Sequence, residues 1–153
     1  MRTLPIKVLV LALAGCQPAK PFPSDYPYKL GLLAGKLEEP AVTLEVCNRN
    51  FPQFAINNEA AHKSLLSNIS LLSKELEDRE RHLSRYIPDI RKQRKDQIND
   101  HIQYSEARFK SLGEFYFKEI CETYPQHTNS KNFIDDITDG ISELRVLLPD
   151  YER

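Results

Sequence analysis

The sequence contains no tryptophan and only five glycines among its 153 residues. So few glycines argue against an all-β fold, in which glycine-rich turns separate many short strands. Hydrophobic residues make up 41% and charged residues 28% of the chain, a balance typical of a helix-rich globular domain. This length suits one domain. The formal net charge is -1, so no overall positive field attracts nucleic acid, and we expect no nucleic-acid partner.

Motifs that carry catalysis or hold a cofactor are also missing. The sequence contains no HExxH, no GxSxG and no glycine-rich phosphate loop. No cysteine or histidine pair has the spacing of a zinc site. The adjacent carboxylates Asp135 and Asp136 point about 100° apart on a helix, so they do not converge as an acid and a base must. We therefore expect no enzymatic activity, no cofactor and no metal site.

The N-terminus carries a hydrophobic run that is too short to span a membrane. Arg2 and Lys7 give a positive start, and residues 8–14 form a run of seven apolar residues. A transmembrane helix needs about 20 such residues. A positive start, a short apolar run and small residues after it are typical of a secretory signal peptide. The alternative is a buried or amphipathic helix, but the run lacks the polar residues that a core helix normally contains.

The end of this run, Leu13-Ala14-Gly15-Cys16, resembles the lipobox of bacterial lipoproteins at all four positions. The resemblance implies removal of residues 1–15, a diacylglycerol thioether on Cys16 and acylation of its new amino group. Several acyl chains on one residue make a stable membrane anchor, whereas one chain binds weakly. Gln17 stands where an Asp tends to retain lipoproteins in the inner membrane. The resemblance therefore implies a lipid anchor in the outer membrane, with the domain facing the periplasm.

Two cysteines remain if Cys16 carries lipid. In an oxidising periplasm, Cys47 and Cys121 are expected to form a disulfide. Closing the long loop between them would stabilise the fold by roughly 4 kcal/mol. Two separate buried thiols and an intermolecular bridge are the alternatives.

Proline positions divide the rest of the chain into a tether and helices. Prolines at 18, 21, 23 and 27 predict that residues 16–28 form an extended tether to a helical domain at 29–153. A short helix is predicted to begin at Pro40, with this proline in its first turn, and to end before Phe51-Pro52. Two long helices are predicted at about 52–86 and 89–122, with a turn at Pro88 between them. A last helix is predicted at about 130–148.

Apolar residues recur at steps of three and four in the three longer helices. The stripes are Leu65, Ile69, Leu72, Leu76, Leu83 and Tyr86, interrupted by Arg79; Ile98, Ile102, Ser105, Phe109, Leu112, Tyr116 and Ile120; and Phe133 or Ile134, Ile137, Ile141, Leu144 and Leu148. The pattern predicts an all-α fold. The two long helices form an antiparallel hairpin, and the short N-terminal helix and the C-terminal helix pack on it as a small bundle.

Two surface features are candidates for contacts. Arg91, Lys92, Arg94 and Lys95 form a basic run near the predicted hairpin tip. A solvated helix face is the simpler interpretation, and a contact with an anionic surface, such as lipid headgroups or an acidic partner, is the functional one. Next to Tyr116 in the second stripe, Phe115 and Phe117 cannot both be covered by the same partner helix. We expect the last helix to cover one of them, and coverage by a partner protein is the alternative.

These features predict a non-enzymatic bacterial lipoprotein whose helical domain binds another protein of the cell envelope. The alternative is a periplasmic inhibitor or immunity-type lipoprotein that blocks a toxin or a wall hydrolase. Both interpretations require membrane attachment through the lipid at Cys16.

Overall fold

The computed structural model describes residues 22–87 and 90–149, apart from the side chains of residues 90–95. The helices are α1 (Tyr26–Asn50), the 3₁₀ turn η1 (Pro52–Phe54), α2 (Ala55–Asn68), α3 (Ser70–Leu83), α4 (Ile90–Ser111), α5 (Glu114–Glu122), α6 (Tyr124–Thr128) and α7 (Lys131–Leu147). No strand occurs within these ranges, and the helices pack against one another. The prediction of an all-α bundle is confirmed.

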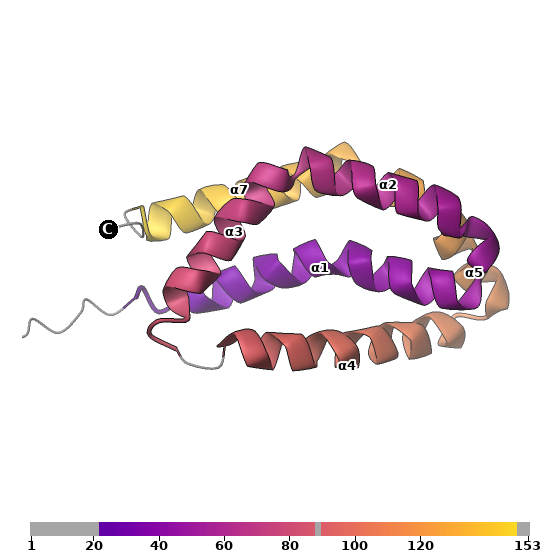
Figure 1. The fold of residues 1–153 in the computed structure, drawn as a ribbon, viewed down its shortest axis with the longest axis horizontal. Helices are drawn as coiled ribbons and strands as arrows, with labels where there is room; N and C mark the ends of the chain where they lie inside the picture. The colour runs from indigo at the N-terminus through magenta and orange to yellow at the C-terminus, as the bar shows by residue number, and fades with distance from the viewer. Residues whose placement is uncertain (1–21, 88–89, 150–153) are drawn as a thin grey trace, which may run out of the picture.

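Helix α1 lies at the centre of the bundle (Figure 1). It has α2 and α3 on one side and α4 on the other, and it also contacts α5 and α7. The two predicted arms, α2 with α3 and α4, run in opposite directions, but α1 lies between them. Apolar residues on more than one face of α1 explain this placement. Its buried side chains are those of Tyr26, Leu30, Leu33, Ala34, Pro40, Val42, Val46 and Cys47.

The prediction of a short helix that starts at Pro40 is wrong. Helix α1 is 25 residues long and continues through Gly31, Gly35 and Pro40. Proline has no N–H to donate to the carbonyl of Lys36, and in a helix interior it costs about 3 kcal/mol. Each of the two glycines in the helix interior costs up to about 1 kcal/mol more. Burial of large side chains along α1 outweighs these local preferences.

The predicted long helix at 52–86 is divided in two at Ile69. This residue ends α2 and precedes α3, but its N–H still donates to the Leu65 carbonyl and its carbonyl accepts from the Ser73 N–H. The break is therefore a bend within a nearly continuous helical path. Figure 1 shows that the bend curves α2 and α3 over α1. As a result α2 contacts α1 and α6, whereas α3 contacts α1 and α7.

The predicted helix at 89–122 is also divided, at Gly113. Gly113 has a φ of 91°, a backbone conformation that side chains other than glycine rarely adopt, and it is the N-cap of α5. The change of direction alters which residues face inward. Phe117 and Cys121 are buried, whereas Tyr116 is exposed. The predicted core stripe therefore fails beyond Phe109.

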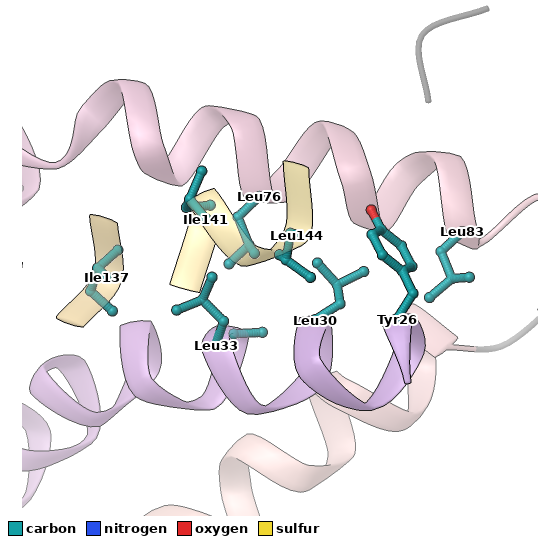
Figure 2. Close-up of a cluster of buried hydrophobic side chains, with 9 residues drawn as sticks. Tyr26, Leu30, Leu33, Leu76, Leu83, Ile137, Ile141 and Leu144 are labelled. Carbon is teal, nitrogen blue, oxygen red and sulfur yellow. The ribbon is translucent and has the colours of Figure 1, made fainter. Parts of the chain in front are cut away.

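The main core lies where α1, α3 and α7 meet (Figure 2). It contains Tyr26, Leu30, Leu33, Ala34, Leu76, Leu83, Ile137, Ile141 and Leu144. The C-terminal stripe is confirmed, because Ile137, Ile141 and Leu144 are fully buried. Gly140 allows close approach of α7 to α1, since a Cβ at this position would lie 2.7 Å from Leu33 Cδ1.

Candidate functional site

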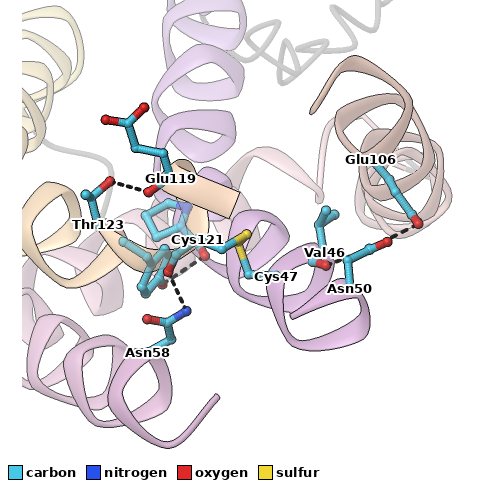
Figure 3. Close-up of a disulfide and its surroundings, with 10 residues drawn as sticks. Val46, Cys47, Asn50, Asn58, Glu106, Glu119, Cys121 and Thr123 are labelled. Atoms are coloured by element: carbon cyan, nitrogen blue, oxygen red, sulfur yellow. Dashed lines mark hydrogen bonds between the residues drawn. A yellow bond between two sulfur atoms is a disulfide. The ribbon is translucent and has the colours of Figure 1, made fainter. Parts of the chain in front are cut away.

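A disulfide joins Cys47 of α1 to Cys121 of α5 at one end of the bundle (Figure 3). The Sγ–Sγ distance is 2.05 Å, and both residues are completely buried. The predicted pairing is confirmed. The Asn58 side-chain amide of α2 donates a 3.0 Å hydrogen bond to the Cys121 carbonyl. The bridge therefore lies where α1, α2 and α5 converge.

Aromatic side chains pack beside the disulfide and hold the inner face of α5. Phe117 contacts Phe51 and Phe109, with ring centroids 4.9 and 5.6 Å apart respectively. The expectation that the last helix covers an aromatic residue of α5 is wrong. The ring of Phe117 belongs to a second core cluster with Val46 and the disulfide, separate from the core of α7.

The outer face of α5 leaves large apolar side chains exposed. We define the α5 surface as Phe115 and Tyr116 together with Leu112, which precedes the helix, and Ile120, which is partly buried. Phe115 is 75% exposed and Tyr116 is 60% exposed, and their ring centroids lie 5.4 Å apart in an edge-to-face arrangement. Leu112, Tyr116 and Ile120 also line a groove that continues to His127 of α6. Two exposed aromatic rings beside a groove form a surface suited to contact with another protein.

The first described residues of the chain lie at the opposite end of the bundle. Phe22 packs on Tyr26 with ring centroids 5.7 Å apart, and it meets Tyr86 edge-on at 5.0 Å. At 1.5 Å per residue, α1 separates Tyr26 from Cys47 by roughly 30 Å. Figure 1 shows α5 at the end of the molecule away from the start of α1. The α5 surface and the tether therefore lie at opposite ends of α1.

A buried arginine fastens three helices at the tether end. Arg79 of α3 is 1% exposed, although the sequence pattern treats it as a polar interruption of the core stripe. Its Nη1 donates to the carbonyls of Leu144 and Leu148, at 3.3 and 3.1 Å, and to the Tyr26 hydroxyl at 3.4 Å. A guanidinium at these carbonyls also complements the negative end of the α7 dipole. Arg79 thus joins α3 to α1 and α7.

The carboxylate of Glu75 balances the buried charge of Arg79 and the more exposed charge of Arg145. It accepts hydrogen bonds from Arg79 Nη2 at 2.9 Å and from Arg145 Nη2 of α7 at 2.5 Å. The hydrogen bond from Arg145 is the largest of the effects that lower the pKa of Glu75. The two arginines hold this carboxyl in its ionised form.

A hydrogen-bonded chain also connects α1, α2 and α6. The Tyr124 hydroxyl donates to the Pro40 carbonyl at 2.9 Å and lies 2.8 Å from His62 Nδ1. Because the hydroxyl proton is used on Pro40, Nδ1 of His62 is the donor in the second bond. Burial lowers the pKa of His62 and raises that of Tyr124. Both groups are neutral in this chain, which suits a structural connection.

The other residues singled out in the sequence lie partly or wholly outside the described residues. Cys16 precedes the first of them. The backbone at Arg91, Lys92, Arg94 and Lys95 belongs to the first turns of α4, but their side chains are outside the description. Among the described residues no group of three or more His, Cys, Asp or Glu side chains could hold a metal ion.

Sequence reasoning singled out the aromatic residues 115–117 as a candidate contact but placed Tyr116 in the core, and it missed the role of Arg79. Gly113, directly before Glu114, was the available signal for a new helix and therefore for a change of buried face. No described helix is both long enough and apolar enough to cross a membrane. Comparisons of the chain with protein-family models, characterised proteins and solved structures find no match.

Proposed function

We propose that this chain is a lipid-anchored protein of the bacterial envelope whose helical domain binds another envelope protein through the α5 surface. The proposal assigns no catalysis to the domain. The observation that carries it is the position of Phe115 and Tyr116, exposed at the end of the bundle away from the segment that leads to Cys16.

The α5 surface has the composition of a binding site. Aromatic residues are enriched at protein interfaces and often dominate their binding energy. Glu114, Lys118 and Glu119 are exposed beside the two rings, and they supply the polar rim that such interfaces have. This arrangement fits a partner segment with large apolar side chains that enter the groove beside Tyr116.

The α5 surface is also held in a fixed conformation. The disulfide joins α5 to α1, and Phe117 is packed beneath it. A preorganised surface loses little conformational entropy when a partner binds. A lipid anchor at the tether end would separate the α5 surface from the attached end of the domain by roughly the length of α1, about 30 Å.

The anchor is tested by replacing the lipidated cysteine. C16S should leave the protein unlipidated and should release it from its membrane or mislocalise it, because acylation at this position requires the cysteine thiol. Fractionation of envelopes and mass spectrometry of the mature N-terminus measure this. The matched control is Q17D, which keeps Cys16 and should stay in membranes but move toward the inner one. An unchanged membrane fraction for C16S would refute the lipid anchor.

The binding surface is tested by copurification from crosslinked envelopes. F115S/Y116S should reduce recovery of the partner at least 30-fold, because one aromatic hot spot contributes about 2 kcal/mol or more. The control L71S/V146S changes two apolar residues that are equally exposed, on α3 and α7. It should retain the partner.

Two results would contradict this role. Equal loss of the partner in both double variants would mean that the α5 surface is not specific. A measured turnover on an envelope substrate, with no partner recovered, would replace binding by catalysis. If the partner is a wall hydrolase or a toxin that becomes inhibited, the same surface serves the inhibitor alternative.

A further inference from the structure

A pocket lies where α1, α6 and the first turn of α7 meet. Its volume is about 220 Å³. Most of the residues that line it carry rings: Pro40 of α1, Tyr124 and His127 of α6, and Phe133 of α7. We name it the Pro40 pocket. It is distinct from the groove of the α5 surface, although His127 borders both.

Hydrogen bonds fix the walls of the Pro40 pocket. The Tyr124 hydroxyl donates to the Pro40 carbonyl at 2.9 Å, and the Thr128 hydroxyl donates to the Tyr124 carbonyl at 3.0 Å. At the start of α7, the Phe133 N–H donates to the Ser130 hydroxyl oxygen at 3.3 Å. Tyr124 and Thr128 are also almost completely buried. The walls are therefore held in place before a ligand binds, which lowers the entropic cost of binding.

Pro40 itself points to a role beyond the helix. An ordinary residue at this position would donate its N–H to the Lys36 carbonyl, whereas a proline in a helix interior costs about 3 kcal/mol. Exceptions of this kind are expected at functional sites. The Pro40 ring is buried and lines the pocket, and it cannot rotate into the empty space as a longer side chain could. A proline at this position therefore keeps the pocket open.

The rim of the Pro40 pocket carries a negative charge. Glu39 lines the pocket, and its side chain is exposed. Within the described part of the chain, no basic group pairs with this carboxylate. Lys36 of α1 and Lys131 of α7 are instead paired with Asp136 and Asp135. A cation at the rim would be favoured by the Glu39 carboxylate, and aromatic rings also attract cations to their faces.

The volume of the pocket limits the size of a ligand. An apolar cavity of about 150 Å³ binds benzene, and pockets for drug-sized molecules begin at about 300 Å³. The volume of about 220 Å³ lies between these values. The pocket therefore suits one ring, or an aliphatic group of similar size, that carries a short polar chain.

We propose that the Pro40 pocket binds a small organic amine, with its apolar group among the rings and its ammonium group at the Glu39 carboxylate. This site goes beyond the proposed function, because it uses neither the lipid anchor nor the α5 surface. A lysine side chain of another protein carries the same ammonium group, but its straight chain fills less of the volume. The size of the pocket therefore favours a free amine with a ring.

The experiment titrates the isotope-labelled chain from Gln17 onward with two probes of equal size. Both core clusters, the disulfide and the Pro40 pocket are formed by residues that follow Gln17. The probes are 2-phenylethylamine and its neutral analogue 2-phenylethanol, and binding is followed by the shifts of amide resonances. We expect saturable shifts at Thr43, Thr128 and Phe133 with both probes. The amine should bind about fivefold more tightly, the most that an exposed ion pair contributes.

Two variants separate the charge at the rim from the ring in the wall. E39Q should reduce the affinity for the amine to that for the alcohol and leave the affinity for the alcohol unchanged. The control E77Q removes an exposed carboxylate of α3 and should change neither affinity. P40A restores a helical N–H and should remain folded in urea titrations. It should nevertheless weaken both probes at least about fourfold, the contribution of one buried CH₂ group.

Four results would overturn this site. They are absence of saturable shifts at the pocket, equal affinities of the wild type for the amine and the alcohol, equal effects of E39Q and E77Q, and unchanged binding by P40A. Tighter binding of n-butylamine, which has the chain of a lysine, would also overturn it and assign the pocket to a lysine of another protein. Each of these results leaves the tests of the lipid anchor and the α5 surface unaffected.

Discussion

The variant C47A/C121A should lose about 4 kcal/mol of unfolding free energy relative to the oxidised wild type. The reason is that the disulfide closes a loop with a sequence separation of 74, which restricts the unfolded chain. Both side chains are also completely buried, so their replacement removes packing at the junction of α1 and α5. Urea unfolding under non-reducing conditions measures the difference.

A reductant provides the matched control for this result. Reduction should lower the urea midpoint of the wild type toward that of C47A/C121A, whereas the midpoint of the variant should not change. A wild-type midpoint that is insensitive to reduction would contradict the stabilising role of the bridge. Because the disulfide holds α5, loss of stability should be accompanied by weaker recovery of the partner.

The variant E75Q should lose about 3 kcal/mol at neutral pH. Removing one partner of a buried ion pair typically costs about 3 to 5 kcal/mol, because the remaining charge stays buried without compensation. Here the Arg79 side chain is 1% exposed, and the Glu75 side chain is 18% exposed. The partly exposed carboxylate places the expected cost at the lower end. Urea unfolding against the exposed-site control E77Q, which should change by less than about 0.5 kcal/mol, measures it.

The difference in unfolding free energy between wild type and E75Q should depend on pH, because the pKa of Glu75 is lowered in the folded protein. A carboxyl with a lower pKa in the folded state than in the unfolded chain stabilises the fold above the unfolded value of 4.5. This contribution is lost as the pH falls through the lower folded value, because the carboxylate then becomes protonated. The gap between wild type and E75Q should therefore shrink in acid. A gap that stays constant down to the lower pKa and below it would contradict the ion-pair explanation.

The helical class and the position of the disulfide were predictable from the sequence. The stripe at Ile137, Ile141 and Leu144 is regular, and all three residues are fully buried in one continuous helix. Cys47 and Cys121 were placed correctly because each lies near a helix end that a proline marks. In these segments local helix preference and tertiary packing agree. Apolar residues spaced three and four positions apart are therefore enough to predict the helix and its buried face.

Helix α1 shows where local preference misleads. Pro40, Gly31 and Gly35 all oppose a continuous helix, yet the chain is helical from Tyr26 to Asn50. The compensating energy comes from burial against helices that lie far away in sequence. Apolar residues on more than one face of α1 indicate that it is covered on more than one side, but they do not identify the helices that cover it.

The α5 surface and Arg79 show a second limit. Because the helix changes direction at Gly113, Phe117 is buried in place of the predicted Tyr116. A prediction from periodicity assumes one straight helix and therefore misses this change. Arg79 interrupts an apolar stripe and is nevertheless buried, because Glu75 and the carbonyls at the end of α7 satisfy it. Glu75 lies four residues before Arg79 on the same helix, but the carbonyls of Leu144 and Leu148 become its neighbours only in the folded chain.

The most direct test of the proposed role is site-specific photocrosslinking in living cells. A photoreactive amino acid replaces Tyr116 in one strain and Val146, an apolar residue on α7 that is even more exposed, in another. We expect one discrete adduct with an envelope protein from position 116 and none from position 146. Identical adducts from both positions, or none from position 116, would contradict a partner bound at the α5 surface.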